Sequence, residues 1–441
     1  MKVQLVRPPM NFCTPGQMED NVSYPVGLCL LAEAVREKNP GVKVEVIDGH
    51  KRPMDEVLGK IDGDVVGATC IYSNYDNALA VLRHAKERGA MTVIGGANVT
   101  HIGKRILANR EFVDLAVVND GEDALPEIVS GKAGYGTPNL VYRTMGGQIM
   151  ESPKRNAPLT TTFDLEDLVD RERWKPQSIP VSGIRGCMKA EKSSLCDFCS
   201  IDHKLKVMNP ELMWQQARIL KGYGFDYLWE VGETLFPGYL NELLKTRPKD
   251  MGDMKWKFYV CADLVNEDFA ESLKQLGTKE VQMGIETPND NILKMVNKKS
   301  RLSDINRAVA LLDRKGIDIH AAFMYGLTGE TPESAQRTYE FAKSLVSEHP
   351  NIKKITTSHA VPFVGTGMFN RIVGNDRARN EYSGDLERDD KFDYEELTRL
   401  YDRHFTSVKF EDMAKLVKQT RELMNGRGYG TSFAIGPGDG K

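Results

Sequence analysis

The chain has 441 residues, of which 27% are charged and 41% hydrophobic, and its formal net charge at pH 7 is −3. This length predicts two or three domains with an ample core, and the near-neutral charge gives no bulk electrostatic reason to bind nucleic acid. The sequence contains no apolar run of about 18 residues, so it predicts no membrane span. No signal peptide is expected before the first strand. Seven cysteines, three of them clustered, fit a reduced cytoplasm better than a disulfide framework.

Residues 1–140 alternate short apolar segments with helical ones, which predicts an α/β fold with a Rossmann-like, doubly wound parallel sheet. Ligands of such sheets bind beyond the carboxyl ends of the strands. No G-x-G-x-x-G motif follows the first strand, which disfavours a dinucleotide. The predicted strands are 3–6, 42–47, 65–70, 92–94 and 115–118, and their ends carry the candidate ligand residues Thr69, Ser73, Gly95, Gly96, Gly121 and Glu122.

A polar run follows the second predicted strand and has two interpretations. Asp48 and His50 form an Asp-x-His pair, which is able to supply an imidazole ligand to cobalt oriented by a carboxylate. Pro53 stands where such a motif is expected to have glycine, and the run does not follow the first strand. A polar turn at a strand end is therefore the favoured interpretation.

The segment 141–175 is rich in Pro, Thr and charge and is predicted to connect two domains. The alternation of strands and helices then resumes, so residues 176–370 are predicted to form a partial (β/α)6 TIM-type barrel. Residues 371–441 are predicted to be a small helical region with a solvated charged loop at 376–390 and a Gly-rich tail. The expected barrel strands are 179–184, 227–231, 257–261, 281–285, 319–325 and 354–359, and the expected C-terminal helices are 394–404 and 410–424.

Three cysteines, Cys187, Cys196 and Cys199, follow the first barrel strand with the spacing C-x8-C-x2-C. Three thiolates in one loop are able to bind a soft metal or an iron–sulfur cluster. A 4Fe–4S cluster would find only three protein ligands here, which would leave the fourth iron open to a substrate or cofactor. With His203 the same cysteines form a complete set of zinc ligands. A zinc-binding sensor or interaction protein is therefore an alternative from a different functional class.

Glycine and glutamate recur at the ends of the later barrel strands, where close backbone approach and carboxylate contacts to a ligand are favoured. Together with Arg185-Gly186-Cys187 and Cys196-Asp197-Phe198-Cys199, these motifs resemble those of the radical S-adenosylmethionine superfamily, in the branch with an N-terminal cobalamin-binding-like domain. The resemblance covers about residues 1–370. The later motifs are Gly232-Glu233, Gly284-Ile285-Glu286-Thr287, Asn297-Lys298 and Gly326-Leu327-Thr328-Gly329-Glu330-Thr331.

The resemblance implies that the three cysteines ligate three irons and that the unique iron takes the amino and carboxylate groups of S-adenosylmethionine. It places Gly232 and Glu233 at the methionine amine, Glu286 at the ribose, Phe198 over adenine or cluster, and Gly326 and Gly329 in a later cofactor-binding signature. The family's usual spacing is C-x3-C-x2-C, so the first gap here is five residues longer. A longer loop costs little closure entropy, and cluster binding is still expected.

The first functional expectation is cobalamin-dependent methyl transfer to an unactivated centre of a small metabolite or natural-product intermediate. The alternative within the family is cobalamin-free cyclisation, dehydration or rearrangement. The resemblance also implies a reductant such as flavodoxin or ferredoxin. Tyr325 and His359, at barrel strand positions, are candidates to contact substrate or relay a proton, with core packing as the alternative.

Overall fold

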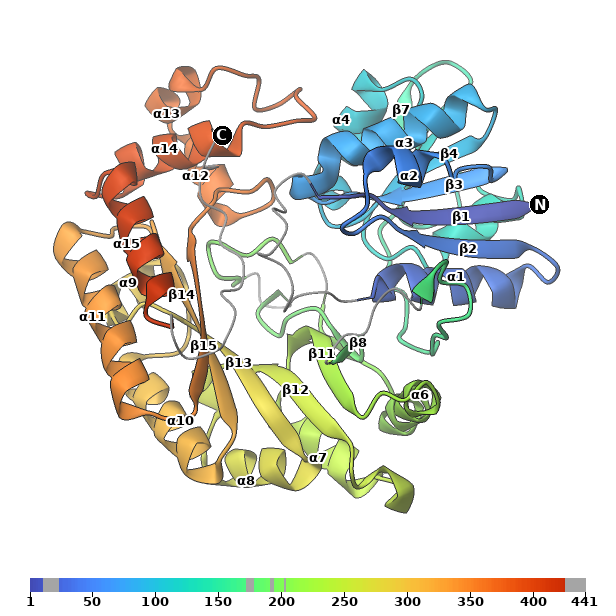
Figure 1. The fold of residues 1–441 in the computed structure, drawn as a ribbon. Helices are drawn as coiled ribbons and strands as arrows, with labels where there is room; N and C mark the ends of the chain where they lie inside the picture. The colour runs from blue at the N-terminus through green and yellow to red at the C-terminus, as the bar shows by residue number, and fades with distance from the viewer. Residues whose placement is uncertain (11–23, 172–177, 191–193, 202–203, 425–441) are drawn as a thin grey trace. The chain divides into compact units, whose positions relative to one another are not determined.

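The computed structural model describes residues 1–10, 24–171, 178–190, 194–201 and 204–424, which form two compact units (Figure 1). Unit 1 contains Met1–Pro15, Ser23–Pro176 and Glu387–Lys391, and unit 2 contains Gly16–Val22, Gln177–Leu386 and Phe392–Lys441. The predicted Gly-rich tail lies outside the described residues. In the part of the chain that is described, no helix combines the length and the hydropathy needed to cross a bilayer.

Unit 1 has a sheet in which seven described strands are ordered β2-β1-β3-β4-β5-β6-β7. The first five strands pair in parallel, and helices follow them, which confirms the predicted Rossmann-like architecture. Alternating apolar side chains such as Val3 and Leu5 in β1 are buried, because helices cover the sheet. The strands are β1 (Lys2–Arg7), β2 (Lys43–Asp48), β3 (Val65–Thr69), β4 (Met91–Gly95), β5 (Leu115–Val117), β6 (Leu140–Arg143) and β7 (Ile149–Glu151), and the helices are α1 (Val26–Lys38), α2 (Met54–Leu58), α3 (Tyr75–Glu87), α4 (Val99–Asn109) and α5 (Ala124–Val129).

The sheet of unit 1 departs from the sequence prediction at one edge. β6 and β7 lie inside the segment predicted to be a connection, and they pair antiparallel with β5 and with each other. Their turn closes through a hydrogen bond from the amide of Thr144 to the carbonyl of Gln148, with Gly147 at a φ of +79°. The strands are short, and β7 is partly exposed, so their hydrophobic pattern is too weak to distinguish them from a loop.

The charged stretch 376–390 also differs from its prediction as a solvated loop. α13 (Asp376–Glu381) occupies its beginning, and its end, with the residues that follow, packs within unit 1. Asp390 is only 4% exposed because it accepts hydrogen bonds from the hydroxyl of Tyr75 at 2.6 Å and from the guanidinium of Arg110 at 2.8 and 3.0 Å. A charged composition predicts an exposed segment, but an ion pair with a residue far away in the sequence offsets the free-energy cost of burying Asp390.

Unit 2 is built on a sheet of six parallel strands among the residues described, in the order β15-β14-β13-β12-β11-β8. Because the strands follow chain order and helices connect them, the sheet is the predicted partial barrel (Figure 1). A two-stranded antiparallel pair, β9 (Ile184–Arg185) with β10 (Lys206–Val207), brackets the cysteine loop. The strands are β8 (Ile179–Val181), β11 (Tyr227–Thr234), β12 (Lys255–Val260), β13 (Thr278–Glu286), β14 (Asp318–Tyr325) and β15 (Ile352–His359), and the helices are α6 (Pro210–Gly222), α7 (Pro237–Lys245), α8 (Glu267–Leu276), α9 (Asp290–Met295), α10 (Leu302–Lys315), α11 (Pro332–Glu348), α12 (Gly367–Gly374), α14 (Tyr394–Phe405) and α15 (Phe410–Glu422).

The two faces of the barrel sheet have different chemistry. On the helix-covered face, Trp256 packs edge-on against Trp214 of α6 at 5.6 Å between ring centroids, and Phe258 beside it is 1% exposed. Strand residues alternate between faces, so Tyr259 and Gln282 lie on the opposite face. Both remain partly exposed although they lie in the middle of a sheet. The opposite face is therefore not packed as a dry core.

The buried Asp390 offers a test of how residues 387–391 are held in unit 1. Changing Asp390 to Ala removes the acceptor of both Tyr75 and Arg110, and a broken buried charge pair typically costs about 3 kcal/mol. We expect the thermal unfolding midpoint of Asp390→Ala to fall by several degrees. Asp376→Ala is the control, since Asp376 is 82% exposed and pairs only with Arg379 of its own helix. Equal unfolding midpoints for the two variants would contradict the conclusion that the contacts of Asp390 hold residues 387–391 in unit 1.

Candidate active site

The three cysteines lie in the loop between β9 and β10, which is fixed by backbone hydrogen bonds to two other segments of unit 2. The amide of Asp197 donates to the carbonyl of Val296 at 3.0 Å, and the amide of Met368 donates to the carbonyl of Asp197 at 3.0 Å. Within the loop the amide of Cys199 donates to the carbonyl of Cys196 at 2.9 Å. The C-x2-C end of the motif is thus a tight turn with a defined position.

Asn297, which follows α9, holds the same loop. Its φ is +59°, and its side-chain amide donates to the carbonyls of Ser194 at 2.7 Å and Leu195 at 2.9 Å. Asparagine tolerates this left-handed conformation better than most residues. Lys189, in the part of the loop that is longer than the family spacing, donates from Nζ to the Sγ of Cys196 at 3.3 Å and to the carbonyl of Asn297.

The surroundings favour thiolate at one of the cysteines. The pKa of Cys196 is lowered to about 6, first by its hydrogen bond with Cys199 and then by the nearby cations of Lys298 and Lys189. The same hydrogen bond, together with burial, raises the pKa of Cys199. Thiolate is the form that binds iron, so the lowered pKa of Cys196 favours metal binding.

The donor set fits an iron–sulfur cluster. In a cluster each thiolate takes a different iron, so the ligands need not converge on one point. Within the described ranges, no three His, Cys, Asp or Glu side chains are grouped as they would be around one metal ion. His203, the fourth ligand of the zinc alternative, lies outside the described residues.

A glutamate that the sequence analysis did not single out, Glu230, holds the backbone of the predicted ligand residues at the end of β11. Glu230 is fully buried and accepts hydrogen bonds from the amides of Gly183 at 2.7 Å and Gly232 at 2.8 Å. A Cβ at Gly232 would lie 1.6 Å from the carbonyl oxygen of Ile184, so only glycine fits. Burial raises the pKa of Glu233 to about 7. A glutamate inside an otherwise apolar strand was the available signal for Glu230.

Glu286, at the end of β13, lies in a strained and buried position. Its φ is +61°, and its Oε1 lies 2.7 Å from Nζ of Lys298. Burial alone would lower the pKa of Lys298, but the charge of Glu286 outweighs it and the pKa is raised. A Cβ at Gly284 would meet Glu286 Oε1 at 2.5 Å. The ion pair therefore joins the end of β13 to the segment that holds the cysteine loop.

A tight loop follows β14 and carries the predicted residues Gly326 and Gly329, whose φ values are +81° and +78°. The buried carboxylate of Glu330 accepts the amide of Gly326 at 2.6 Å, and burial raises its pKa to about 8. A Cβ at Gly326 would lie 2.6 Å from the ring of His359. The loop is thus held rigidly at the carboxyl end of the sheet.

Tyr325 and His359 lie in the packing layer between the sheet and the C-terminal helices. The hydroxyl of Tyr325 bonds the hydroxyl of Thr420 at 2.7 Å, and the His359 ring stacks on Phe410 and lies 2.8 Å from Asp402. Tyr325 is 0% and His359 3% exposed. This placement favours the packing alternative, because both side chains face the helices, and the predicted contact with substrate stays a prediction.

Phe198 is partly exposed within the turn between Cys196 and Cys199. This position keeps the ring next to the predicted cluster ligands. The predicted contact with adenine or cluster stays a prediction.

In unit 1 the predicted ligand residues gather at the carboxyl edge of three neighbouring strands. Thr69 and Gly95 end β3 and β4, which pair directly, and Gly121 and Glu122 follow β5. Gly96 has a φ of +105°, and a Cβ there would meet the Cys70 carbonyl oxygen at 2.7 Å. Parallel sheets bind ligands at such an edge. Ser73 lies in the same region, in the turn after β3, where its side chain is buried.

The Asp48 and His50 pair is a buried turn. Both carboxylate oxygens of Asp48 accept the guanidinium of Arg7, at 2.7 and 2.6 Å, and Oδ1 also accepts the backbone amide of His50 at 3.0 Å. Asp48 therefore orients backbone rather than imidazole in this turn. His50 itself is 2% exposed. The favoured interpretation as a polar turn describes this geometry.

A parallel partial barrel with three cysteines at its mouth, preceded by a Rossmann-like unit, defines a class of cofactor-dependent enzyme. Comparison with known families identifies it: residues 181–342 match the radical SAM superfamily and residues 20–129 match the B12 binding domain. The chain belongs to the radical SAM superfamily, in the group with an N-terminal B12-binding domain. Its cofactors are accordingly a 4Fe–4S cluster, S-adenosylmethionine and cobalamin.

Several known proteins are similar over most of the chain. An uncharacterized methyltransferase of Pyrococcus horikoshii is 25% identical over 85% of this chain and 84% of its own length. The bacteriochlorophyllide d C-12(1)-methyltransferase of Chlorobaculum tepidum is 25% identical over 81% of this chain and 75% of its own. The solved structure of the methyltransferase TsrM from Kitasatospora setae, with cobalamin and a 4Fe–4S cluster bound, has a TM-score of 0.74 at 16% identity and covers 100% of this chain and 92% of its own. That likeness shows the shared fold.

The loop cysteines are tested by iron content. After anaerobic reconstitution, Cys187→Ala, Cys196→Ala and Cys199→Ala should each lose most of the bound iron and sulfide, because each removes one of three protein ligands. Cys261→Ala is the matched control: Cys261 lies at the end of β12, where its Sγ is 3.5 Å from Thr234 Oγ1, but outside the motif. Full iron content in any loop variant, or its loss in Cys261→Ala, would contradict the assignment.

Proposed function

We propose that this enzyme transfers a methyl group from S-adenosylmethionine, by way of cobalamin, to an unactivated centre of a small metabolite or natural-product intermediate. The observation that carries the proposal is the three-cysteine loop at the mouth of a partial barrel in a chain that also has a B12-binding unit. The similar proteins named as methyltransferases match over both units of the chain, which supports the same reaction class.

In the proposed reaction the chain's own residues bind and orient the cofactors. Cys187, Cys196 and Cys199 would hold three irons of the cluster, and the bound cluster, S-adenosylmethionine and cobalamin would supply the electron transfer and the methyl group. Glu233 would accept a hydrogen bond from the amino group of S-adenosylmethionine, for which a half-buried carboxylate with no ion pair among the described residues is suited. Glu286, held by Lys298, has a second oxygen for a ribose hydroxyl. In unit 1 the carboxyl edge with Thr69 and Gly96 takes cobalamin.

The substrate and the electron donor belong to the same proposal. A flavodoxin or ferredoxin would deliver the electron, and the reduced cytoplasm suits the free cysteines of the described residues. A second reaction class has one observation in its favour. The anaerobic magnesium-protoporphyrin IX monomethyl ester cyclase of Rubrivivax gelatinosus is 26% identical over 65% of this chain and 55% of its own length. Radical cyclisation is therefore the candidate to test against methylation.

The reaction class is tested with S-adenosylmethionine carrying a deuterated methyl group. We expect the reconstituted enzyme with cobalamin and a reductant to release S-adenosylhomocysteine and to transfer the label, first to the corrin fraction and then to substrate-containing extract. Chromatography with mass spectrometry follows each product. The Cys196→Ala variant supplies the background. Turnover that produces 5′-deoxyadenosine, leaves the label on methionine and is unchanged without cobalamin would contradict methyl transfer and favour cyclisation.

The role of Glu233 predicts a pH dependence of cofactor binding. Its pKa is raised to about 7 by burial, so the carboxylate is largely neutral below that pH and charged above it. The dissociation constant of S-adenosylmethionine should rise as the pH falls through about 7. Glu233→Gln should weaken binding at high pH and remove most of this dependence. Equilibrium dialysis measures both, and an unchanged pH profile in Glu233→Gln would exclude Glu233 as the partner of the amino group.

A further inference from the structure

The face of the barrel sheet opposite the helices carries a layer of charged and polar side chains near its amino-terminal end. Lys257 of β12 and Glu280 of β13 are register partners and form an ion pair at 2.7 Å. His320 of β14 lies 3.8 Å from Glu280 and is register partner to Lys354 of β15. Lys257 is 7% and His320 4% exposed. We call these four residues the floor of the barrel.

The floor has more positive than negative charge. Lys257 pairs with Glu280, whereas no carboxylate among the described residues pairs with Lys354. His320 adds no charge, since burial and the two lysines lower its pKa well below the usual value. Two ammonium groups against one carboxylate leave one positive charge in a space that water reaches only in part. Lys354, which carries the surplus charge, is only partly exposed, so leaving it unpaired has a moderate cost that a bound anion would offset.

A second, independent observation at the same place is a buried donor that lacks an acceptor. The indole Nε1 of Trp229 is buried and has no hydrogen-bond acceptor in the described part of the chain. Trp229 is the register partner of Lys257, whose Nζ lies 4.4 Å from the centroid of the indole ring. Tyr259 is 6.1 Å from the same ring, centroid to centroid. A buried N–H of this kind is normally satisfied, so the missing acceptor points to a ligand.

We propose that the floor binds the anionic end of the substrate, a carboxylate or phosphate, through Lys257, Lys354 and the indole N–H of Trp229. Tyr259 and the ring of Trp229 then flank the body of the substrate, which extends toward the carboxyl ends of the strands. This inference rests on the proposed function, because it assumes that the barrel face holds the substrate of that reaction.

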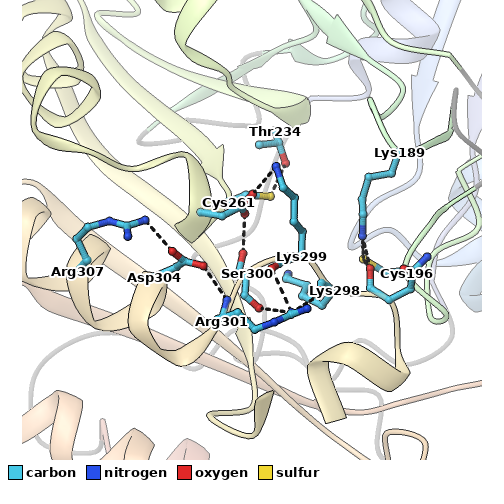
Figure 2. A network of polar contacts seen from close by, with 12 residues as sticks. Lys189, Cys196, Thr234, Cys261, Lys298, Lys299, Ser300, Arg301, Asp304 and Arg307 are labelled. Carbon is cyan, nitrogen blue, oxygen red and sulfur yellow. Dashed lines mark hydrogen bonds and ion pairs between the residues drawn. The ribbon is translucent and has the colours of Figure 1, made fainter. Parts of the chain in front are cut away.

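The fold also limits how long the substrate is. Cys261 directly follows β12 and lies four positions after Lys257, which is about 13 Å at the rise of a strand. Cys261 lies at the cluster end of the sheet, where the charges of Cys196 and Lys298 affect its pKa (Figure 2). The reacting centre of the substrate therefore lies on the order of 10 Å from its anionic group. This describes an elongated organic anion rather than a small one such as acetate.

The floor is tested without knowing the substrate, by recording the indole N–H resonances of the reconstituted full chain. The chain has four tryptophans, and Trp229→Phe assigns the resonance of interest. The probes are phenylacetate, phenyl phosphate and the neutral phenylacetamide, each titrated into the millimolar range. Phenylacetate or phenyl phosphate should shift the Trp229 resonance and phenylacetamide should not. The stronger of the two anions identifies the substrate's acidic group.

The variants separate charge recognition from a structural role. Lys257→Met should lower the affinity for the anion by about tenfold or more, and Lys257→Arg should restore much of that affinity. Lys354→Met should lower the affinity less. Lys279→Met is the control, since Lys279 is 58% exposed on the neighbouring strand. An equal response to phenylacetate and phenylacetamide, no response to either anion, or unchanged affinity in Lys257→Met would overturn the proposal.

Cleavage of S-adenosylmethionine, measured in the same preparations, distinguishes failure of the floor from failure of the proposed function. Cofactor cleavage by wild type together with no anion response would overturn only the floor. No cleavage by wild type would overturn the proposed function, whichever way the anions bind. Lys279→Met should retain the cleavage that occurs without substrate, and a circular dichroism spectrum of Lys257→Met that matches wild type would show that this variant folds.

Discussion

The buried ion pair between Glu286 and Lys298 is the interaction on which the candidate site depends. It joins the strained end of β13 to a segment whose preceding residue, Asn297, holds two carbonyls of the cysteine loop. The cation also lies close enough to Cys196 to lower its pKa. One pair of charges therefore fixes a strand end, positions the loop and favours the thiolate. Because both partners are nearly buried, losing either would leave an uncompensated charge in the same place.

Two other buried carboxylates also hold backbone in place at the mouth of the barrel. Glu230 holds the amides of Gly183 and Gly232, and Glu330 holds the amide of Gly326. The glycines in turn allow the backbone to approach a ligand without a side chain between them. The ligand-facing surface is thus built from backbone that carboxylates hold in place.

The sequence predicted what depends on local pattern. Apolar strands, helical periodicity and cysteine spacing were enough for the Rossmann-like unit, the partial barrel and the loop with Cys187, Cys196 and Cys199. It missed what depends on partners far away in the chain. Asp390 is charged and was predicted to be solvated, yet Arg110, 280 residues earlier, keeps it buried. The packing of Tyr325 and His359 against the C-terminal helices could not be predicted for a related reason, since a residue number within a strand does not say which face the side chain occupies until the register is known.

The central claim is that three cysteines leave one iron of the cluster open to S-adenosylmethionine. Electron–nuclear double resonance on the reduced cluster tests it most directly, using S-adenosylmethionine with a nitrogen isotope label in its amino group. We expect a coupling between the labelled nitrogen and the cluster that changes with the isotope. A spectrum that is the same with labelled, unlabelled and no S-adenosylmethionine would contradict it.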